Sequence, residues 1–131
     1  MDLPKISDCM STDFAKIKAD MPVAEASKNL IKKVLLGGPV VDDHGCLIGW
    51  ISEQDCLKVT VQVVYLNQRV ATVQEVMSSD VLVVKESDDL LSVAQQMLEA
   101  KPKAYPVVNE QNKVLGVITR RHILDQLATH I

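Results

Sequence analysis

A serine and an aspartate three residues apart, Ser52 and Asp55, directly follow the apolar segment "LIGWI". A serine at this place is a common helix N-cap, and a carboxylate in the first turn interacts favourably with the helix dipole. A hydroxyl group beside a carboxylate that accepts several hydrogen bonds can also hold a small polar ligand. The pair alone leaves both interpretations open.

The remaining reactive side chains form no pattern typical of catalysis or metal binding. The glycine pair at 37–38 lacks the Lys and Ser/Thr that complete a phosphate-binding loop. His44 and Cys46 have no third ligand at suitable spacing, and Cys9, Cys46 and Cys56 include no CxxC pair. We therefore expect no enzyme activity, no metal site and no disulfide framework.

Composition limits the classes of protein that the chain can form. Of its 131 residues, 47% are hydrophobic and only 3% are aromatic, which predicts an aliphatic α/β core. The net charge of -3 and the lack of a basic run argue against a nucleic-acid partner. The N-terminal "MDLPKISDCM" does not resemble a signal peptide, and no apolar run approaches the roughly 18 residues of a membrane span. We expect a cytoplasmic protein.

The chain contains an internal repeat. "MSTD" from Met10 and "MSSD" from Met77 fix an offset of 77 − 10 = 67, which also places "PVVDDHGCLIGWIS" over "PVVNEQNKVLGVIT" without a gap. At this offset Ser52 corresponds to Thr119, and Asp55 corresponds to His122. Two copies of one supersecondary unit explain this pattern.

Each copy is predicted to form strand, helix, strand, strand and helix. The apolar periodicities and turn residues place the first helices at 23–34 and 90–98, the hairpins at 39–51 and 106–118, and the last helices at 53–66 and 120–128. We take Ser87 as the N-cap of the 90–98 helix, and Gly37 and Gly38 as the stop of the 23–34 helix. The predicted organisation is a first repeat with the N-terminal segment at 1–66, a linker at 67–72 and a second repeat at 73–131. One repeat is too small to bury its own apolar faces, so we expect the two to pack together.

A Met-Ser/Thr before the first strand, a "PVV" hairpin and a Gly-apolar-apolar-Ser/Thr ending occur twice in order at constant spacing. This combination resembles the cystathionine β-synthase (CBS) domain, and the tandem pair, from residue 6 to about 128, resembles a Bateman module. The resemblance implies an α/β (α+β) fold of two β-α-β-β-α CBS repeats with pseudo-two-fold symmetry. It also implies an inter-repeat cleft with two candidate adenine-nucleotide sites.

The resemblance further implies a stand-alone regulatory module that requires no cofactor, binds an adenine nucleotide (AMP, ADP or ATP) and signals to a separate, unidentified protein. The alternative is a ligand-independent dimerisation or interaction module. Apolar residues occur on more than one stripe of "ASKNLIKKVLL" and "LLSVAQQML", so we expect a homodimer formed through these helices.

By the resemblance, Asp55 accepts the hydroxyl groups of a ribose and Ser52 fixes the sugar or phosphate. The second copy retains Thr119 but has His122 in place of the aspartate, which puts a second ribose site in doubt. Arg120 and Arg121 oppose the dipole of the following helix, by roughly 0.3 to 1 kcal/mol each. They are either phosphate contacts, reached by a nucleotide held at Asp55, or solvated surface residues.

The other predicted nucleotide contacts precede the hairpins or the first strands. They are Leu36, Gly38 and Pro39 in the first copy, Tyr105 and Pro106 with Lys101 and Lys103 in the second, and the possible phosphate donors Ser11, Thr12, Ser78 and Ser79. Gly38 would leave room for a flat base. The hydroxyl groups could instead cap the strands, and the lysines could belong to a solvated loop. Trp50 is expected to pack against the protein and not against a ligand.

Overall fold

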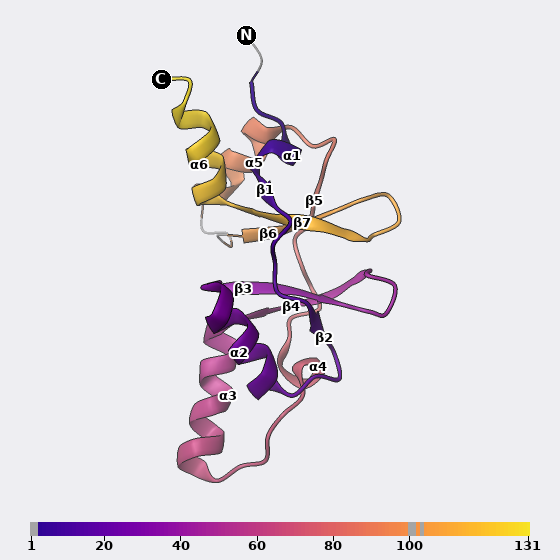
Figure 1. Cartoon of the computed structure of the whole chain (residues 1–131), viewed down its shortest axis with the longest axis vertical. Helices are drawn as coiled ribbons and strands as arrows, with labels where there is room; N and C mark the ends of the chain where they lie inside the picture. The colour runs from indigo at the N-terminus through magenta and orange to yellow at the C-terminus, as the bar shows by residue number, and fades with distance from the viewer. Residues whose placement is uncertain (1–2, 100–101, 103) are drawn as a thin grey trace. The chain divides into compact units, whose positions relative to one another are not determined.

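The structure is a computed structural model that describes residues 3–99, 102 and 104–131 (Figure 1). The helices are α1 (Ile6–Cys9), α2 (Val23–Lys33), α3 (Glu53–Leu66), α4 (Val73–Val76), α5 (Leu90–Met97) and α6 (Arg120–Ala128). The strands are β1 (Met10–Ser11), β2 (Ile17–Lys18), β3 (Gly37–Val41), β4 (Leu47–Ser52), β5 (Val84–Lys85), β6 (Ala104–Val108) and β7 (Val114–Thr119). The fold is mixed α/β, as predicted.

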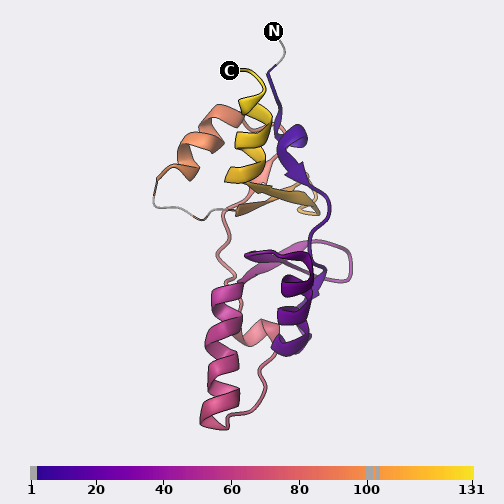
Figure 2. The same cartoon turned by 60° about the vertical axis from the view of Figure 1, so that its left-hand side comes forward.

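The chain divides into two compact units. Residues 14–81 form one, which we call the first-repeat unit, and residues 1–13 with 82–131 form the other, the second-repeat unit. The N-terminal segment thus belongs to the second-repeat unit, and the predicted limits of the sequence repeats stay a prediction. Figure 2 shows α2, α3 and α4 with the β2-β3-β4 sheet in the first-repeat unit.

In the first-repeat unit, β2 runs parallel to β3, and β3 pairs antiparallel with β4. The chain that follows α4 adds to the outer edge of β4. There the amide of Trp50 donates to the carbonyl of Ser78 at 2.8 Å, and the amide of Ser78 donates to the carbonyl of Trp50 at 2.9 Å. The Met77-Ser78 segment therefore lies along the hairpin of the first repeat.

The second-repeat unit has the same arrangement in the order β1-β7-β6-β5. β5 runs parallel to β6, β6 pairs antiparallel with β7, and Met10 lies opposite Ile118 in the antiparallel pair of β1 and β7. Each Met-Ser segment thus pairs with the hairpin of the other sequence repeat, an exchange that the sequence analysis did not predict.

Each unit has its own aliphatic core, in line with the composition. In the first-repeat unit the buried side chains are Ala15, Ile17, Val23, Ala26, Leu30, Val40, Ile51, Cys56 and Val73. In the second-repeat unit they are Ile6, Cys9, Val84, Leu90, Val93, Met97, Tyr105, Val107, Ile118 and Ile123. Among the described helices, none combines the length and apolar character needed to cross a membrane.

Three predicted details of the first helices are wrong. α2 ends at Lys33 because Val34 adopts a left-handed conformation (φ 55°, ψ 49°) and the amide of Leu35 closes the helix by donating to the carbonyl of Leu30 at 3.0 Å. Gly37 and Gly38, predicted to end this helix, instead begin β3. Val34, which follows the last residue of α2, is exposed.

The third detail is the start of α5. Its N-cap is Asp89 and not Ser87, since the Asp89 carboxylate accepts a hydrogen bond from the amide of Ser92 at 3.2 Å. The last helices, α3 and α6, have the predicted limits.

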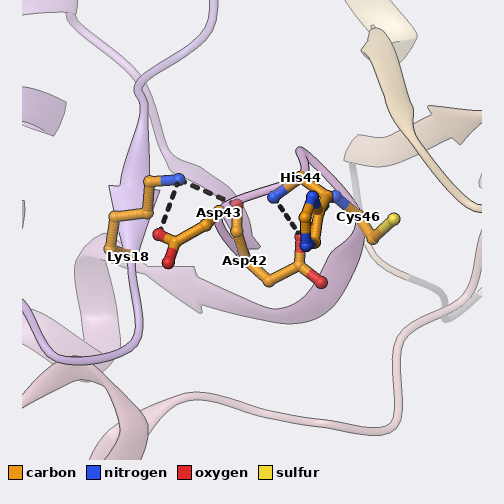
Figure 3. Close-up of polar contacts among 5 residues, drawn as sticks. All are labelled: Lys18, Asp42, Asp43, His44 and Cys46. Atoms are coloured by element: carbon orange, nitrogen blue, oxygen red, sulfur yellow. Dashed lines mark hydrogen bonds and ion pairs between the residues drawn. The ribbon is translucent and has the colours of Figure 1, made fainter.

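A carboxylate organises the turn between β3 and β4 (Figure 3). Oδ1 of Asp42 accepts hydrogen bonds from the amides of His44 at 2.8 Å and Cys46 at 2.9 Å. Nζ of Lys18 donates to the carbonyl of Asp42 at 2.8 Å and lies 3.8 Å from Oδ1 of Asp43. The hydrogen bonds from the Cys46 and then the His44 amide lower the pKa of Asp42, and Lys18 adds to this effect.

The turn between β6 and β7 is built in the same way around a neutral side chain. Oδ1 of Asn109 accepts from the amides of Gln111 at 2.9 Å and Lys113 at 3.0 Å. Gly45 (φ 81°) and Asn112 (φ 64°) take the left-handed position in the respective turns, as their residue types predict.

We predict that Asp42→Ala lowers the free energy of unfolding at pH 7, while Asp42→Asn, which reproduces the turn of Asn109, largely preserves it. The folded-state pKa of Asp42 is lowered, so its charged form stabilises the fold above the unfolded pKa of about 3.9 and this contribution is lost as the pH falls through the folded value. Urea unfolding at pH 7 and pH 3 should show a weaker pH dependence for Asp42→Asn. The prediction is wrong if this variant is as unstable at pH 7 as Asp42→Ala.

Candidate functional site

Ser52 and Asp55 form a reciprocal cap at the start of α3. Oγ of Ser52 accepts a hydrogen bond from the amide of Asp55 at 3.1 Å, and Oδ2 of Asp55 accepts one from the amide of Ser52 at 3.0 Å. Both side chains are half-buried. Oδ1 of Asp55 has no hydrogen-bond partner among the described residues. The N-cap interpretation is thus confirmed, and one carboxylate oxygen remains available.

The predicted contacts of the first copy lie close to this cap. The amide of Glu53 donates to the carbonyl of Leu36 at 2.8 Å, and Pro39 lies opposite Trp50 in the β3–β4 pair. Gly38 does not offer the predicted space for a base on its side-chain side. A Cβ atom there would meet the core side chains of Ile17 at 3.5 Å and Leu30 at 3.6 Å.

Trp50 packs against the neighbouring strand, as predicted. A Cβ atom at Gly37 would lie 2.6 Å from Nε1 of Trp50, so the indole ring occupies the place where a side chain at position 37 would stand. The ring is half-buried. It therefore explains why the first residue of β3 is a glycine.

A polar groove of about 440 Å³ adjoins Asp55 within the first-repeat unit. It is lined by Asp55, Lys58, Val59 and Gln62 of α3, by Gln68, Arg69 and Ala71 of the following segment, and by Glu75 and Val76 of α4. Of these lining residues, only Asp55 was predicted from the sequence. Helical spacing could have identified the lining residues of α3, because positions 55, 58 and 62 fall on one face of this helix.

The equivalent place in the second-repeat unit has only half of the cap. Oγ1 of Thr119 accepts from the amide of His122 at 3.1 Å, but Nδ1 of His122 is buried without a hydrogen-bond partner in the described part of the chain. Arg120 and Arg121 are exposed at the start of α6 and form no ion pair among the described residues. A phosphate role for them stays a prediction.

Tyr105 and Pro106 lie on opposite faces of β6, and both are buried. Tyr105 is 1% exposed and belongs to the core, where its hydroxyl has no hydrogen-bond partner within the described structure. Burial, followed by the charge of Glu99, raises its pKa. This position is equivalent to Gly38, and at both places a side chain would face the core of its unit. Ligand contact at Tyr105 and Pro106 remains a prediction that their burial does not favour.

The serine and threonine candidates are divided between the units. Ser11 lies opposite Val117 in the second-repeat unit and accepts a hydrogen bond from the amide of Asp13 at 3.2 Å, while Thr12 is exposed. Ser78 and Ser79 are exposed in the first-repeat unit. Ser52, Asp55, Leu36 and Pro39 thus lie in the first-repeat unit, with the carbonyl of Leu36 bonded to the amide beside the cap. The other unit contains Ser11, Thr12, Thr119, Arg120 and Arg121.

Two further candidates, Lys101 and Lys103, lie outside the described residues. Within the described ranges, no group of three or more His, Cys, Asp or Glu side chains is arranged to hold a metal ion.

We predict that His122→Asp raises the free energy of unfolding by about 0.5 to 1 kcal/mol, because an aspartate there can accept the amide hydrogen of Thr119 and interact with the α6 dipole. Asp55→Ala should have the opposite effect, a loss of about 1 kcal/mol, since it removes the corresponding bond in α3. Urea denaturation at pH 7 measures both changes, with His122→Ala as the control for removal of the imidazole. A His122→Asp variant no more stable than His122→Ala would contradict this account of the cap.

Known proteins share this architecture. CBSX2 is a chloroplastic CBS domain-containing protein of Arabidopsis thaliana. It is 26% identical over an alignment of 133 positions, gaps included, and the alignment covers 82% of this chain and 56% of the relative. The crystal structure of CBSX2 in complex with AMP matches with a TM-score of 0.84 at 26% identity, over 96% of this chain and 97% of that chain. The CBS domain pair of protein MJ0100, in complex with 5′-methylthioadenosine and S-adenosyl-L-methionine, matches with a TM-score of 0.83 at 27% identity, over 99% and 100% of the two chains.

Similarity also extends to a longer enzyme. The L-aspartate semialdehyde sulfurtransferase of Methanocaldococcus jannaschii is 30% identical over 118 residues, which cover 90% of this chain but 22% of the enzyme. The chain thus spans about a fifth to about half of the length of these curated relatives. The CBS domain family model matches residues 6–61 and again residues 73–129. With both repeats matched in sequence and the pair matched in structure, the chain belongs to the CBS domain family as a tandem CBS pair.

Proposed function

We propose that this CBS pair is a regulatory module that binds an adenosine-containing ligand of the AMP class through the carboxylate of Asp55. The observation that carries the proposal is that only one of the two carboxylate oxygens of Asp55 is used by the helix cap. Oδ2 is held by the amide of Ser52, which fixes the orientation of the group, while Oδ1 has no hydrogen-bond partner among the described residues and Asp55 lines the polar groove. A charged acceptor fixed in advance binds hydroxyl groups at a smaller entropic cost.

The ligands of the relatives support an adenosine-containing molecule. CBSX2 has been crystallised with AMP, and the MJ0100 pair with 5′-methylthioadenosine and S-adenosyl-L-methionine. These three compounds share adenine and a ribose with a free 2′,3′-diol, and differ at the 5′ carbon. The shared diol is the group for which a carboxylate such as Asp55 is a suitable acceptor.

In this proposal the module is not an enzyme and acts through a partner protein. A ligand changes the population of a conformation only through its different affinity for two states, so the partner must bind one of those states preferentially. We place this activity in the cytoplasm, where the three cysteine thiols would stay reduced. Leu36, Pro39, Ser11, Thr12, Thr119, Arg120 and Arg121 remain proposed contacts.

We predict that AMP raises the melting temperature of the wild-type chain, because a ligand at 100 times its dissociation constant adds about 2.7 kcal/mol to the free energy of unfolding. A thermal-shift screen of AMP, ADP, ATP, S-adenosylmethionine, 5′-methylthioadenosine and NAD would identify the ligand. Asp55→Asn should remove most of the shift, since it keeps an acceptor for the Ser52 amide but loses the charge.

Asp89→Asn is the control, because Asp89 is also a capping carboxylate, as the N-cap of α5, and does not line the groove. An undiminished shift for Asp55→Asn, or equal losses for both variants, would contradict the proposed ribose site.

A second candidate function, homodimerisation, is favoured by an apolar groove between α2 and α3. The groove has a volume of about 830 Å³, and on its lining Val34 is 89% exposed, Ile31 75% and Leu57 64%. Val34 is the C-cap residue of α2 and has a left-handed backbone conformation, which is unfavourable for a β-branched residue. The equivalent left-handed residue at the end of α3 is Asn67, a residue type that tolerates this conformation better. An unfavourable, exposed valine at this place is understandable if a second copy of the chain covers it.

We predict that Val34→Asn stabilises the isolated chain by about 1 kcal/mol through relief of the left-handed valine, and at the same time weakens the dimer. Sedimentation at micromolar concentration and urea unfolding measure the two effects. Val70→Asn is the control, since Val70 is 51% exposed but does not line the groove. A monomeric wild-type protein, or equal weakening by both substitutions, would exclude this dimer.

A further inference from the structure

The polar groove beside Asp55 contains a lysine without a partner. Lys58 follows Asp55 by one helical turn, so the two side chains lie on the same face of α3, with about 5 to 6 Å between their Cβ atoms. Both line the groove. Lys58 is exposed and forms no ion pair or side-chain hydrogen bond among the described residues, and no ion pair joins it to Asp55.

The other two charged side chains of the groove neutralise each other. Nη2 of Arg69 lies 2.9 Å from Oε2 of Glu75, an ion pair between the segment after α3 and α4. Because Arg69 and Glu75 are paired, Asp55 and Lys58 are the charged groups lining the groove that remain available to a ligand. One is an acceptor for hydroxyl groups, and the other is a donor to an anion.

We propose that Lys58 binds the anionic group attached to the 5′ carbon of a nucleoside whose ribose diol is bound by Asp55. This inference rests on the proposed function and deepens it. In a ribose, the diol and the 5′ substituent project from different ends of the ring. The step of three residues from Asp55 to Lys58 is a rise of about 4.5 Å along α3, so the two protein groups are offset in the same direction along the helix. The uncharged part of the groove lining consists of Val59, Ala71 and Val76 with the amides of Gln62 and Gln68.

The consequence is selectivity for charge at the 5′ position. A nucleoside with a 5′-phosphate, or with a 5′-linked chain that ends in a carboxylate, would gain a charge-assisted hydrogen bond to Lys58. Adenosine and 5′-methylthioadenosine lack an anion and would leave the ammonium group solvated. Because Lys58 is exposed, salt should weaken the selectivity by screening it.

Isothermal titration of the full chain with AMP, adenosine, S-adenosylmethionine and 5′-methylthioadenosine tests this inference. Lys58→Gln should weaken AMP about tenfold and leave adenosine within about twofold, as expected for one lost hydrogen bond to a charged group. Lys58→Arg should restore most of the AMP affinity. Lys28→Gln, which removes an exposed lysine of α2 away from the groove, should change neither ligand.

The four ligands also separate the two possible anions. A loss for AMP alone assigns Lys58 to phosphate, and a loss for S-adenosylmethionine alone assigns it to the carboxylate. Equal losses for charged and neutral ligands, or equal effects of Lys58→Gln and Lys28→Gln, would overturn the inference. A loss with Asp55→Asn and none with Lys58→Gln would overturn it while the proposed function stands, and a wild-type chain that binds none of the four would overturn both.

Discussion

The architecture of each unit depends on the close approach of a Met-Ser segment to a glycine in the last strand of a hairpin. A Cβ atom at Gly49 would lie 2.5 Å from Sδ of Met77, and one at Gly116 would lie 2.7 Å from the carbonyl oxygen of Ser11. Real Cβ atoms do not approach so closely, so any larger residue would push the added edge away. Because the capped helices start directly after these strands, the same contact supports the place where Asp55 is presented.

The capping interaction and the proposed ligand interaction at Asp55 do not exclude each other. A carboxylate has two oxygens, and the cap with Ser52 uses one of them. The cap also restricts the side chain to one orientation, as a binding site requires. At the equivalent position, His122 presents an aromatic ring whose Nδ1 is buried and unpaired within the described residues, so the second repeat lacks both the full cap and the charge.

The repeat offset and the local turn residues predicted the hairpins and the limits of α3 and α6 because these depend on short-range chemistry. The exchange of the Met-Ser segments was missed, since it depends on which hairpin edge is free and sequence periodicity carries no such information. The burial of Tyr105 in the core was missed for a similar reason. From the sequence alone, a tyrosine before Pro106 is compatible with a core residue and equally with a ligand contact. Lys58 was overlooked because a single helical lysine is distinctive only beside the segment that folds back to form the groove.

The exchange of the Met-Ser segments has a consequence for the order in which the chain folds during synthesis. Residues 14–81 form a continuous unit that can become compact as soon as it leaves the ribosome. Met10, however, pairs with Ile118, which is 118 − 10 = 108 residues later in the chain. The loop that joins them costs entropy before their contact contributes energy. The Met10-Ser11 segment is therefore synthesised well before its native neighbours and is among the last parts of the chain to reach them, and a nascent chain that stops after the first repeat carries an edge strand with no sheet to join.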